Sequence, residues 1–321
     1  MIKFDRITLG KQAKELGFVR DTFEKVCRLS DVLKFLEKDN LLKDTLALKG
    51  GTAINVIIFD LPRLSVDIDL DFSQNLPRDE MLVLREIITE RLSKYMMANG
   101  YLLSGKSKMH HALDSFVYEY QNAGGMKDNI KIEINYMLRT HILPLKRRKV
   151  NLSWLTEDLT VLSVAPMEIF ASKIVALLNR TAPRDLYDIH NLLEFDLFDE
   201  SEQDMLKKCV LFYSCIGSEN VPESFTFDNI NKMPQNKIKT DLLPVLRFGA
   251  YFDLKTARDK VMNYLKDLLV LTPQEKEFMS SFSKGTFKPE LLFDEETAKE
   301  LTFHPMAAWK CQKVTENISK G

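Results

Sequence analysis

The stretch LALKGGTAINVIIFDLPRLSVDIDLDFS, residues 46–73, combines two features that decide the fold. Two glycines end an apolar run at 50–51, and Asp67, Asp69 and Asp71 then alternate with apolar residues in a second run. In a β-strand, residues i and i+2 project from the same face, so Asp67 and Asp69 stand side by side while their apolar neighbours face the opposite, buried side. Carboxylates this close repel one another, so the pattern predicts a positively charged partner.

A second alternating segment, IKIEINY at 130–136, presents Glu133 between two isoleucines. On a neighbouring strand, Glu133 joins Asp67 and Asp69 in a group of three carboxylates. Such a group is suited to one or two Mg²⁺ ions, the usual apparatus of phosphoryl and nucleotidyl transfer. Acidic alternation alone is also typical of the solvated face of an exposed strand, so the metal interpretation depends on the neighbouring motifs.

The glycines supply the neighbouring motif. Gly50, Gly51 and Thr52 precede a segment that we expect to be helical. A glycine turn before a helix lets backbone N–H groups approach a phosphate, with the positive end of the helix behind them. A glycine pair alone marks a turn more often than a phosphate site. The order of glycine turn, helix, paired carboxylates and later carboxylate favours a nucleotide site.

Composition limits the classes of function. The chain has 321 residues, of which 45% are hydrophobic and 28% charged, with a net charge of −1. This profile is typical of a globular protein, and contacts to nucleic acid would require a local basic patch. The N-terminus lacks an apolar signal-peptide core and no segment approaches eighteen uninterrupted apolar residues, so we expect a cytoplasmic protein without membrane contact. The cysteines form no zinc or CxxC spacing, and we expect reduced thiols at Cys27, Cys209, Cys215 and Cys311.

Periodicity predicts an α+β fold. Residues 10–40 carry a helical apolar stripe, strands alternate between 46 and 140 around a helix that ends at Asn99-Gly100, and strand signals nearly vanish after 160. We expect an N-terminal core with a mixed sheet at 1–145 and a helical C-terminal lobe at 146–321, with 143–150 as the connection. A capping box is predicted at Thr272 to Glu275.

Two charged residues lie in apolar helical stripes. On a helical wheel, Lys173 falls inside the apolar sector of PMEIFASKIVALLNR, and Asp185 faces inward in the next helix, with Asp188 at the edge of its stripe. The spacing is compatible with a buried Lys173–Asp185 ion pair that joins two helices, or with groups that point into a site. Spacing alone leaves both interpretations open.

A basic run follows the Glu133 strand. The residues in it are Lys146, Arg147, Arg148 and Lys149. A run of like charges is usually a solvated loop, but its position makes it the best local candidate for contacts to RNA phosphates.

The order of these motifs resembles the polymerase-β-type nucleotidyltransferase superfamily, and within it the AbiEii/AbiGii toxin family. The resemblance rests on Lys49-Gly50-Gly51-Thr52, on RLSVDIDL with Arg63, Ser65, Asp67 and Asp69, on Lys173, and on RDLYDI at 184–189. It covers roughly residues 45–195. It implies a bilobed Mg²⁺-dependent nucleotidyltransferase of a two-gene toxin–antitoxin or phage-abortive system, which transfers a nucleoside monophosphate from an NTP to RNA, with the tRNA 3′ end as the expected acceptor and an antitoxin encoded by a neighbouring gene as partner.

The resemblance also assigns roles to individual residues. It implies that Asp67 and Asp69 hold Mg²⁺ and that Glu133 completes the metal site or helps to deprotonate the attacking hydroxyl. Lys173 is expected to contact the triphosphate, and Asp185 to hold Lys173 or the nucleotide. The expected nucleotide-binding residues are Lys49, Gly50, Gly51, Thr52, Arg63 and Ser65.

Two other classes of function share some of these features. An antibiotic-type nucleotidyltransferase uses the same acids on a small molecule, but it usually needs an acidic pocket for a cationic substrate, whereas the run at 146–149 is basic. A non-catalytic nucleotide-binding module is the other alternative, and intact DxD, GGT and Lys173 argue against it.

Overall fold

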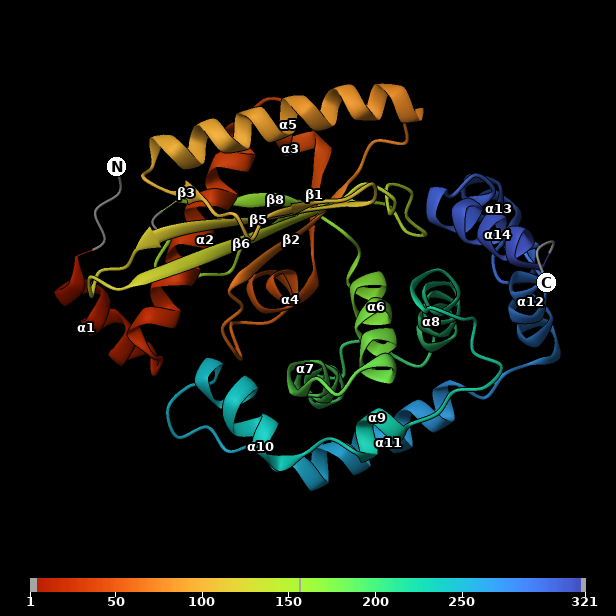
Figure 1. Cartoon of the computed structure of the whole chain (residues 1–321). Helices are drawn as coiled ribbons and strands as arrows, with labels where there is room; N and C mark the ends of the chain where they lie inside the picture. Colours follow the sequence, from red (N-terminus) through yellow and green to blue (C-terminus); the bar gives the residue numbers. More distant parts are fainter. Residues whose placement is uncertain (1–4, 156, 319–321) are drawn as a thin grey trace. The chain divides into compact units, whose positions relative to one another are not determined.

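The computed structural model describes residues 5–155 and 157–318 (Figure 1). The chain divides into two compact units. The N-terminal unit comprises Met1–Arg139, Leu145–Val164 and Leu243–Ala250, and the C-terminal unit comprises Thr140–Pro144, Ala165–Leu242 and Tyr251–Gly321. These bounds differ from the predicted ranges 1–145 and 146–321, because the basic run and the segment after it belong to the sheet of the N-terminal unit and 243–250 returns to that unit.

The N-terminal unit is built on a mixed eight-stranded sheet with the order β3-β5-β6-β2-β1-β8-β7, in which β4 also pairs with β5. The pairs β2–β6 and β1–β8 are parallel, and the other pairs are antiparallel. The strands are β1 (Leu46–Lys49), β2 (Asp67–Phe72), β3 (Leu102–Leu103), β4 (Lys108–Met109), β5 (Leu113–Gln121), β6 (Lys127–Asn135), β7 (Lys146–Lys149) and β8 (Thr160–Ser163).

Strict alternation gives the two faces of β5 and β6 different characters. Even-numbered residues such as Phe116 and Ile132 are buried, and the odd-numbered residues from 113 to 119 and at 131, 133 and 135 are half-buried. The helix α5 (Arg78–Ala98) lies along the buried face (Figure 1), where Arg85 Nε donates to Asp114 Oδ2 at 2.9 Å. The odd-numbered, half-buried face therefore carries the polar residues Lys131 and Glu133.

The predicted end of α5 is confirmed, since Asn99 is its C-cap and Gly100 has a φ of +81°. The single helix predicted at 10–40 is instead two helices, α1 (Arg6–Leu16) and α2 (Arg20–Lys38). They separate at Gly17, whose φ of +77° places it in the left-handed region and ends α1. The remaining short helices of the first hundred residues are α3 (Leu42–Thr45), α4 (Gly50–Ala53) and the π-helical turn η1 (Ile54–Ile58).

The chain passes from one unit to the other at Pro144–Leu145, inside the predicted connection 143–150, but Lys146–Lys149 is the edge strand β7 and not a linker. It pairs with β8 over four residues, from Lys146 opposite Ser163 to Lys149 opposite Thr160. The segment KRRK has no apolar alternation that would mark it as a strand. β7 lies at the edge of the sheet, where a strand tolerates four cations.

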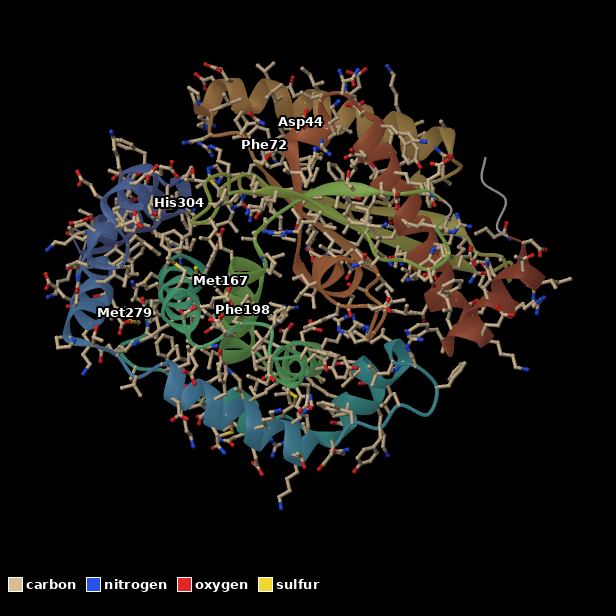
Figure 2. All side chains as sticks on the ribbon, turned by 180° about the vertical axis from the view of Figure 1, so that it is seen from behind. Asp44, Phe72, Met167, Phe198, Met279 and His304 are labelled. Atoms are coloured by element: carbon tan, nitrogen blue, oxygen red, sulfur yellow. The ribbon has the colours of Figure 1, made fainter. Side chains whose placement is uncertain are left out.

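The C-terminal unit is helical, as predicted. Its core includes aromatic contacts such as Phe170–Phe198, with ring centroids 6.0 Å apart, and both Met167 and Phe198 can be followed among its helices in Figure 2. Thr272 and Glu275 form the predicted capping box. The helices are α6 (Pro166–Asn179), α7 (Pro183–Glu194), α8 (Gln203–Gly217), α9 (Asp228–Asn231), α10 (Gln235–Lys237), η2 (Ile238–Leu242), α11 (Leu254–Leu268), α12 (Pro273–Ser283), η4 (Pro289–Leu291), α13 (Glu295–Leu301) and α14 (Pro305–Ile318), while η3 (Leu243–Val245) returns to the N-terminal unit.

The fold class predicted from the sequence, α+β with a mixed sheet and a helical C-terminal region, is confirmed. Within the described residues, none of the helices has the length and apolar character that crossing a lipid bilayer requires.

Candidate active site

The three predicted carboxylates meet on two adjacent strands. β2 runs parallel to β6, with Asp69 opposite Glu133 and Asp67 opposite Lys131. Residues in direct register project from the same face of a sheet, so Asp67, Asp69 and Glu133 share one face. The sequence pattern therefore identified both the strands and the face that they share.

A lysine that the sequence analysis did not single out lies among these acids. Lys131 Nζ is 2.8 Å from Glu133 Oε1. Burial alone would lower the pKa of Lys131, but Glu133, together with the charges of Asp67 and Asp69, outweighs burial and raises it. Lys131 therefore stays charged and offsets part of the repulsion within the carboxylate group.

The third aspartate of the opening motif has a partner of its own. Asp71 is buried, and Lys49, at the end of β1, forms an ion pair with its carboxylate. Burial raises the pKa of Asp71 to about 6, Lys49 opposes that shift, and the charge of Asp69 adds to it. The sequence predicted a positively charged partner for this strand, and the family resemblance assigned Lys49 to the nucleotide. In the structure, the ammonium group of Lys49 pairs with Asp71.

The glycine turn lies directly against β2. Gly50 has a φ of +70°, and a Cβ at this position would lie 2.9 Å from Cγ of Asp69. A Cβ on Gly51 would lie 3.0 Å from Arg63 Nη2 and 3.2 Å from Ser65 Oγ. Space and backbone conformation together favour glycine at Gly50, whereas a side chain at Gly51 would crowd the ends of the Arg63 and Ser65 side chains.

The residues around the turn form a connected polar layer. The Thr52 hydroxyl donates to the backbone carbonyl of Asp67 and lies 3.0 Å from Ser65 Oγ. Thr52 and Arg63 are fully or almost fully buried, and Arg63 Nη1 donates to the Leu64 carbonyl at 3.0 Å. Asn55 Nδ2 donates to the Gly51 carbonyl at 2.7 Å, and this hydrogen bond holds the backbone of the glycine turn in place. The predicted motif residues thus position one another around the start of β2.

The donor set fits a divalent cation of the Mg²⁺ type. Asp67 and Asp69 offer carboxylate oxygens, the ligands that Mg²⁺ prefers, from one face of one strand, and Mg²⁺ commonly uses one or two protein carboxylates together with water and substrate phosphates. Among residues 5–155 and 157–318, no group of three or more Asp, Glu, His or Cys side chains is arranged to hold a metal ion. The two aspartates are therefore the residues that fit Mg²⁺, while the carboxylate of Glu133 forms an ion pair with Lys131.

The second group of predicted residues lies within the C-terminal unit. Lys173 Nζ of α6 is 2.9 Å from Asp185 Oδ1 and 3.3 Å from Asp188 Oδ2, both in α7. Arg180 Nε lies 2.8 Å from the other oxygen of Asp185. Burial alone would raise the pKa of Asp185, but Lys173 and Arg180 outweigh burial and lower it. The predicted Lys173–Asp185 ion pair is present, and the lysine is shared by two carboxylates.

Asp188 is more deeply buried than its predicted place at the edge of the helical stripe indicates. The side chain of Asp188 is 0% exposed, that of Asp185 is 2% exposed and that of Lys173 is 12% exposed. The signal was available, because Asp188 is the second aspartate of RDLYDI. Arg180 gave no comparable signal, since an arginine at the end of a helix is ordinary.

Two of the four cations in the basic run pair with acids of their own unit. Arg147 lies 2.5 Å from Glu37 and 2.9 Å from Asp44, and Lys149 lies 2.6 Å from Asp158. The Arg147 contacts hold β7 against α2 and α3, and the Lys149 contact joins it to the segment before β8. They leave the run with less net positive charge than its sequence indicates.

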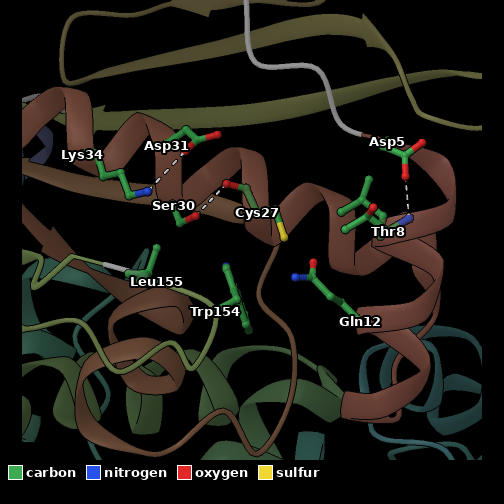
Figure 3. A pocket seen from close by; sticks show the side chains of 10 residues that line it. Asp5, Thr8, Gln12, Cys27, Ser30, Asp31, Lys34, Trp154 and Leu155 are labelled. Carbon is green, nitrogen blue, oxygen red and sulfur yellow. Dashed lines mark hydrogen bonds and ion pairs between the residues drawn. The ribbon is translucent and has the colours of Figure 1, made fainter.

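A pocket of about 380 Å³ opens elsewhere in the N-terminal unit (Figure 3). It lies between α1, α2 and the segment around Trp154, and none of the predicted site residues lines it. Burial raises the pKa of its Cys27 thiol to about 12, so this cysteine is not a nucleophile at neutral pH. The pocket is therefore separate from the site formed by Asp67, Asp69 and Glu133.

Comparison with known proteins gives a family match and a structural match. The family model for the nucleotidyl transferase AbiEii toxin of type IV toxin–antitoxin systems matches residues 34–274. The fold is similar to that of MenT4, a nucleotidyltransferase toxin from Mycobacterium tuberculosis H37Rv, with a TM-score of 0.62 and 14% sequence identity over 95% of this chain and 99% of that chain. No curated protein matches the chain in sequence.

Proposed function

The chain belongs to the AbiEii nucleotidyl transferase toxin family of type IV toxin–antitoxin systems, and from this membership and the geometry of β2 we propose that it transfers a nucleoside monophosphate from an NTP to the 3′ end of an RNA, with tRNA as the acceptor. The observation that carries the proposal is the position of Asp67 and Asp69 beside the Gly50–Gly51 turn. Paired carboxylates next to a phosphate-binding turn are what nucleotidyl transfer requires.

In this proposal Asp67 and Asp69 hold Mg²⁺. The metal, when bound, neutralises charge on the triphosphate and stabilises the oxygens that attack and leave. The backbone of Gly50 and Gly51 approaches the phosphates closely because neither residue has a Cβ. The hydroxyls of Thr52 and Ser65 lie 3.0 Å apart and join this turn to the segment that leads into β2.

The reaction is a displacement at the α-phosphorus. The terminal hydroxyl of the acceptor forms the new oxygen–phosphorus bond, the bond from the α-phosphorus to the oxygen that bridges to the β-phosphate breaks, and pyrophosphate leaves. Glu133 accepts the hydroxyl proton, and Lys131, whose ammonium group lies 2.8 Å from Oε1 of Glu133, holds that carboxylate in place. Lys173 balances the charge of the triphosphate, and Asp185 and Asp188 orient its ammonium group.

The family also implies a partner. A type IV toxin is encoded with an antitoxin, and we propose that the neighbouring gene encodes it and that transfer to RNA arrests growth or aborts phage infection. The basic run Lys146–Lys149 remains a candidate for RNA contacts. Because Arg147 and Lys149 already pair with acids, Lys146 and Arg148 are its better candidates.

Incubation of the purified protein with each α-labelled NTP, Mg²⁺ and total cellular RNA tests the proposal. We expect label in the tRNA fraction with one NTP or a subset of them, and none when Mg²⁺ is chelated. Label in a protein or in a small molecule, with none in RNA under any condition, would show that the acceptor is wrong.

A further inference from the structure

A row of residues crosses the sheet from the carboxylates to its far edge. Asp69 of β2 pairs with Glu133 of β6, Glu133 with Ser115 of β5, and Ser115 with Lys108 of β4. Residues in direct register project from the same face, so Lys108 stands on the carboxylate face of the sheet. Three strand spacings of about 4.8 Å place its backbone about 14 Å from that of Asp69.

A bulge beside Lys108 places a second lysine, Lys106, in a turn at the same edge of the sheet. Ser104 N donates to the Val117 carbonyl at 2.8 Å, and Val117 N donates to Ser107 Oγ at 3.0 Å. Both backbone groups of Val117 are thus satisfied while the residues between the two serines loop out of the sheet as a turn. The turn carries Lys106, which is exposed.

No acid among the described residues forms an ion pair with either of these two lysines. Within residues 5–155 and 157–318, neither Lys106 nor Lys108 forms an ion pair, in contrast to Arg147 and Lys149 of the basic run. The one acid bonded to the bulge, Glu119, accepts a hydrogen bond from the Ser104 hydroxyl at 2.6 Å. The segment Ser104–Met109, named here the lysine edge, therefore presents two available cations on one side of the carboxylate group.

We propose that the lysine edge binds backbone phosphates of the acceptor RNA, upstream of the terminal nucleotide that reacts at Asp67 and Asp69. The proposal rests on the proposed function. An acceptor strand whose 3′ hydroxyl reaches the carboxylates has to lay its preceding phosphates along the protein, and the half-buried face of β6 and β5 leads from the reacting end to Lys108. Lysine is suited to this task as a flexible point charge that needs no base-specific geometry.

A structural role for the same lysines would also be possible in a sheet. Lysines and bulges are common devices that keep edge strands from pairing with other molecules. The two roles differ in what they require of the charge. Protection of the edge is served by either sign, whereas phosphate binding requires positive charge.

The test measures binding of a short fluorescent single-stranded RNA whose terminal nucleotide lacks the acceptor hydroxyls, so that no chemistry takes place. Three full-length variants are compared with wild type over a series of salt concentrations. They are Lys106→Ala/Lys108→Ala, Lys106→Glu/Lys108→Glu, and the control Lys276→Ala/Lys284→Ala, which removes two exposed lysines of the C-terminal unit that also form no ion pair among the described residues.

Loss of the lysine edge should make the log–log dependence of RNA affinity on salt shallower by about 0.7 per lost phosphate contact, hence by about 1.4. The glutamate variant should bind more weakly still and keep the elution volume of wild type in size-exclusion chromatography, and the control should match wild type. Wild-type RNA binding by both lysine-edge variants, with or without aggregation of the alanine variant, would overturn the proposal and leave edge protection. If RNA binding falls as expected but no NTP labels RNA, the proposed function fails while the lysine edge stands.

Discussion

At the scale of single residues, Gly50 carries the strictest requirement of the site. Its φ of +70° disfavours any other residue, and a Cβ would meet Asp69. Gly50→Ala should therefore lose stability, by roughly 1–2 kcal/mol for the left-handed backbone alone, and should also displace the carboxylate. We expect nucleotidyl transfer to fall by at least about tenfold beyond what the loss of folded protein explains, since small displacements of catalytic groups are costly.

Gly249 provides a matched control for this variant. Its φ is +78°, but a Cβ there would meet no atom within 4 Å. Gly249→Ala should show a similar loss of stability in thermal melts with unchanged specific activity of the folded protein. Equal activity in the two variants would show that the contact between Gly50 and Asp69 has no catalytic importance.

The carboxylates themselves give a second prediction at this scale. Asp67→Asn and Asp69→Asn should each abolish transfer, because each removes a charge that holds the metal. Without metal, the melting temperature should hold or rise, since the same change relieves repulsion between neighbouring carboxylates. Transfer that survives in both variants would rule out the proposed metal site.

The site residues that could be predicted from the sequence are those whose contacts follow from the local pattern of one strand, not from the pairing of distant strands. Asp67, Asp69 and Glu133 were predictable because the alternation of a strand fixes which side chains share a face. The Lys49–Asp71 pair was not, because it depends on the register of β1 against β2 across the intervening turn and helix. The position of Lys131 likewise became meaningful only once β6 was known to lie next to β2.

At the scale of elements, the contact between α6 and α7 centres on Lys173. Lys173→Ala removes the cation shared by two buried carboxylates and should cost roughly 3–5 kcal/mol of unfolding free energy. A contact between Lys173 and the triphosphate predicts weaker NTP binding as well. The triple change Lys173→Met/Asp185→Asn/Asp188→Asn should restore much of the stability without restoring NTP affinity. Wild-type NTP affinity in the triple variant would assign Lys173 a purely structural role.

The pH dependence of this cluster follows from the lowered pKa of Asp185. A carboxyl group with a lowered folded-state pKa contributes stability above its unfolded pKa, about 3.9, and loses that contribution as the pH falls through the folded value. The difference in melting temperature between wild type and Lys173→Ala should therefore be largest near neutral pH and narrow below about pH 4. A constant difference across that range would show that Lys173 does not act through the charge of Asp185.

Elements with regular patterns were predicted well, and interruptions of the pattern were not. The apolar stripe and the Asn99-Gly100 end located α5, and alternation located β2 and β6. The break between α1 and α2 was missed because apolar residues continue on both sides of Gly17, and only its left-handed backbone marks the end of α1. β7 was missed because an edge strand of four cations shows no apolar alternation.

At the scale of the whole molecule, the division into units depends on contacts that no local pattern announces. The segment Leu243–Ala250 joins the N-terminal unit although it follows the helices of the C-terminal unit in the chain. There Leu64 N donates to the Val245 carbonyl at 2.8 Å, and Arg63 forms a bridge with Leu246. Residues far along the chain thus form hydrogen bonds with the segment that leads into β2. Only the tertiary structure reveals these contacts.

The central claim is that the protein transfers a nucleotide to the 3′ end of RNA, and one measurement tests it most directly. Purified protein, Mg²⁺ and the active NTP are incubated with intact tRNA or with tRNA whose terminal ribose has been oxidised by periodate, using label in the α-phosphate or in the γ-phosphate. The predicted result is α-label on intact tRNA alone, with γ-label released as pyrophosphate. Equal α-label on intact and oxidised tRNA, γ-label on RNA, or no label on RNA with any NTP would contradict the claim.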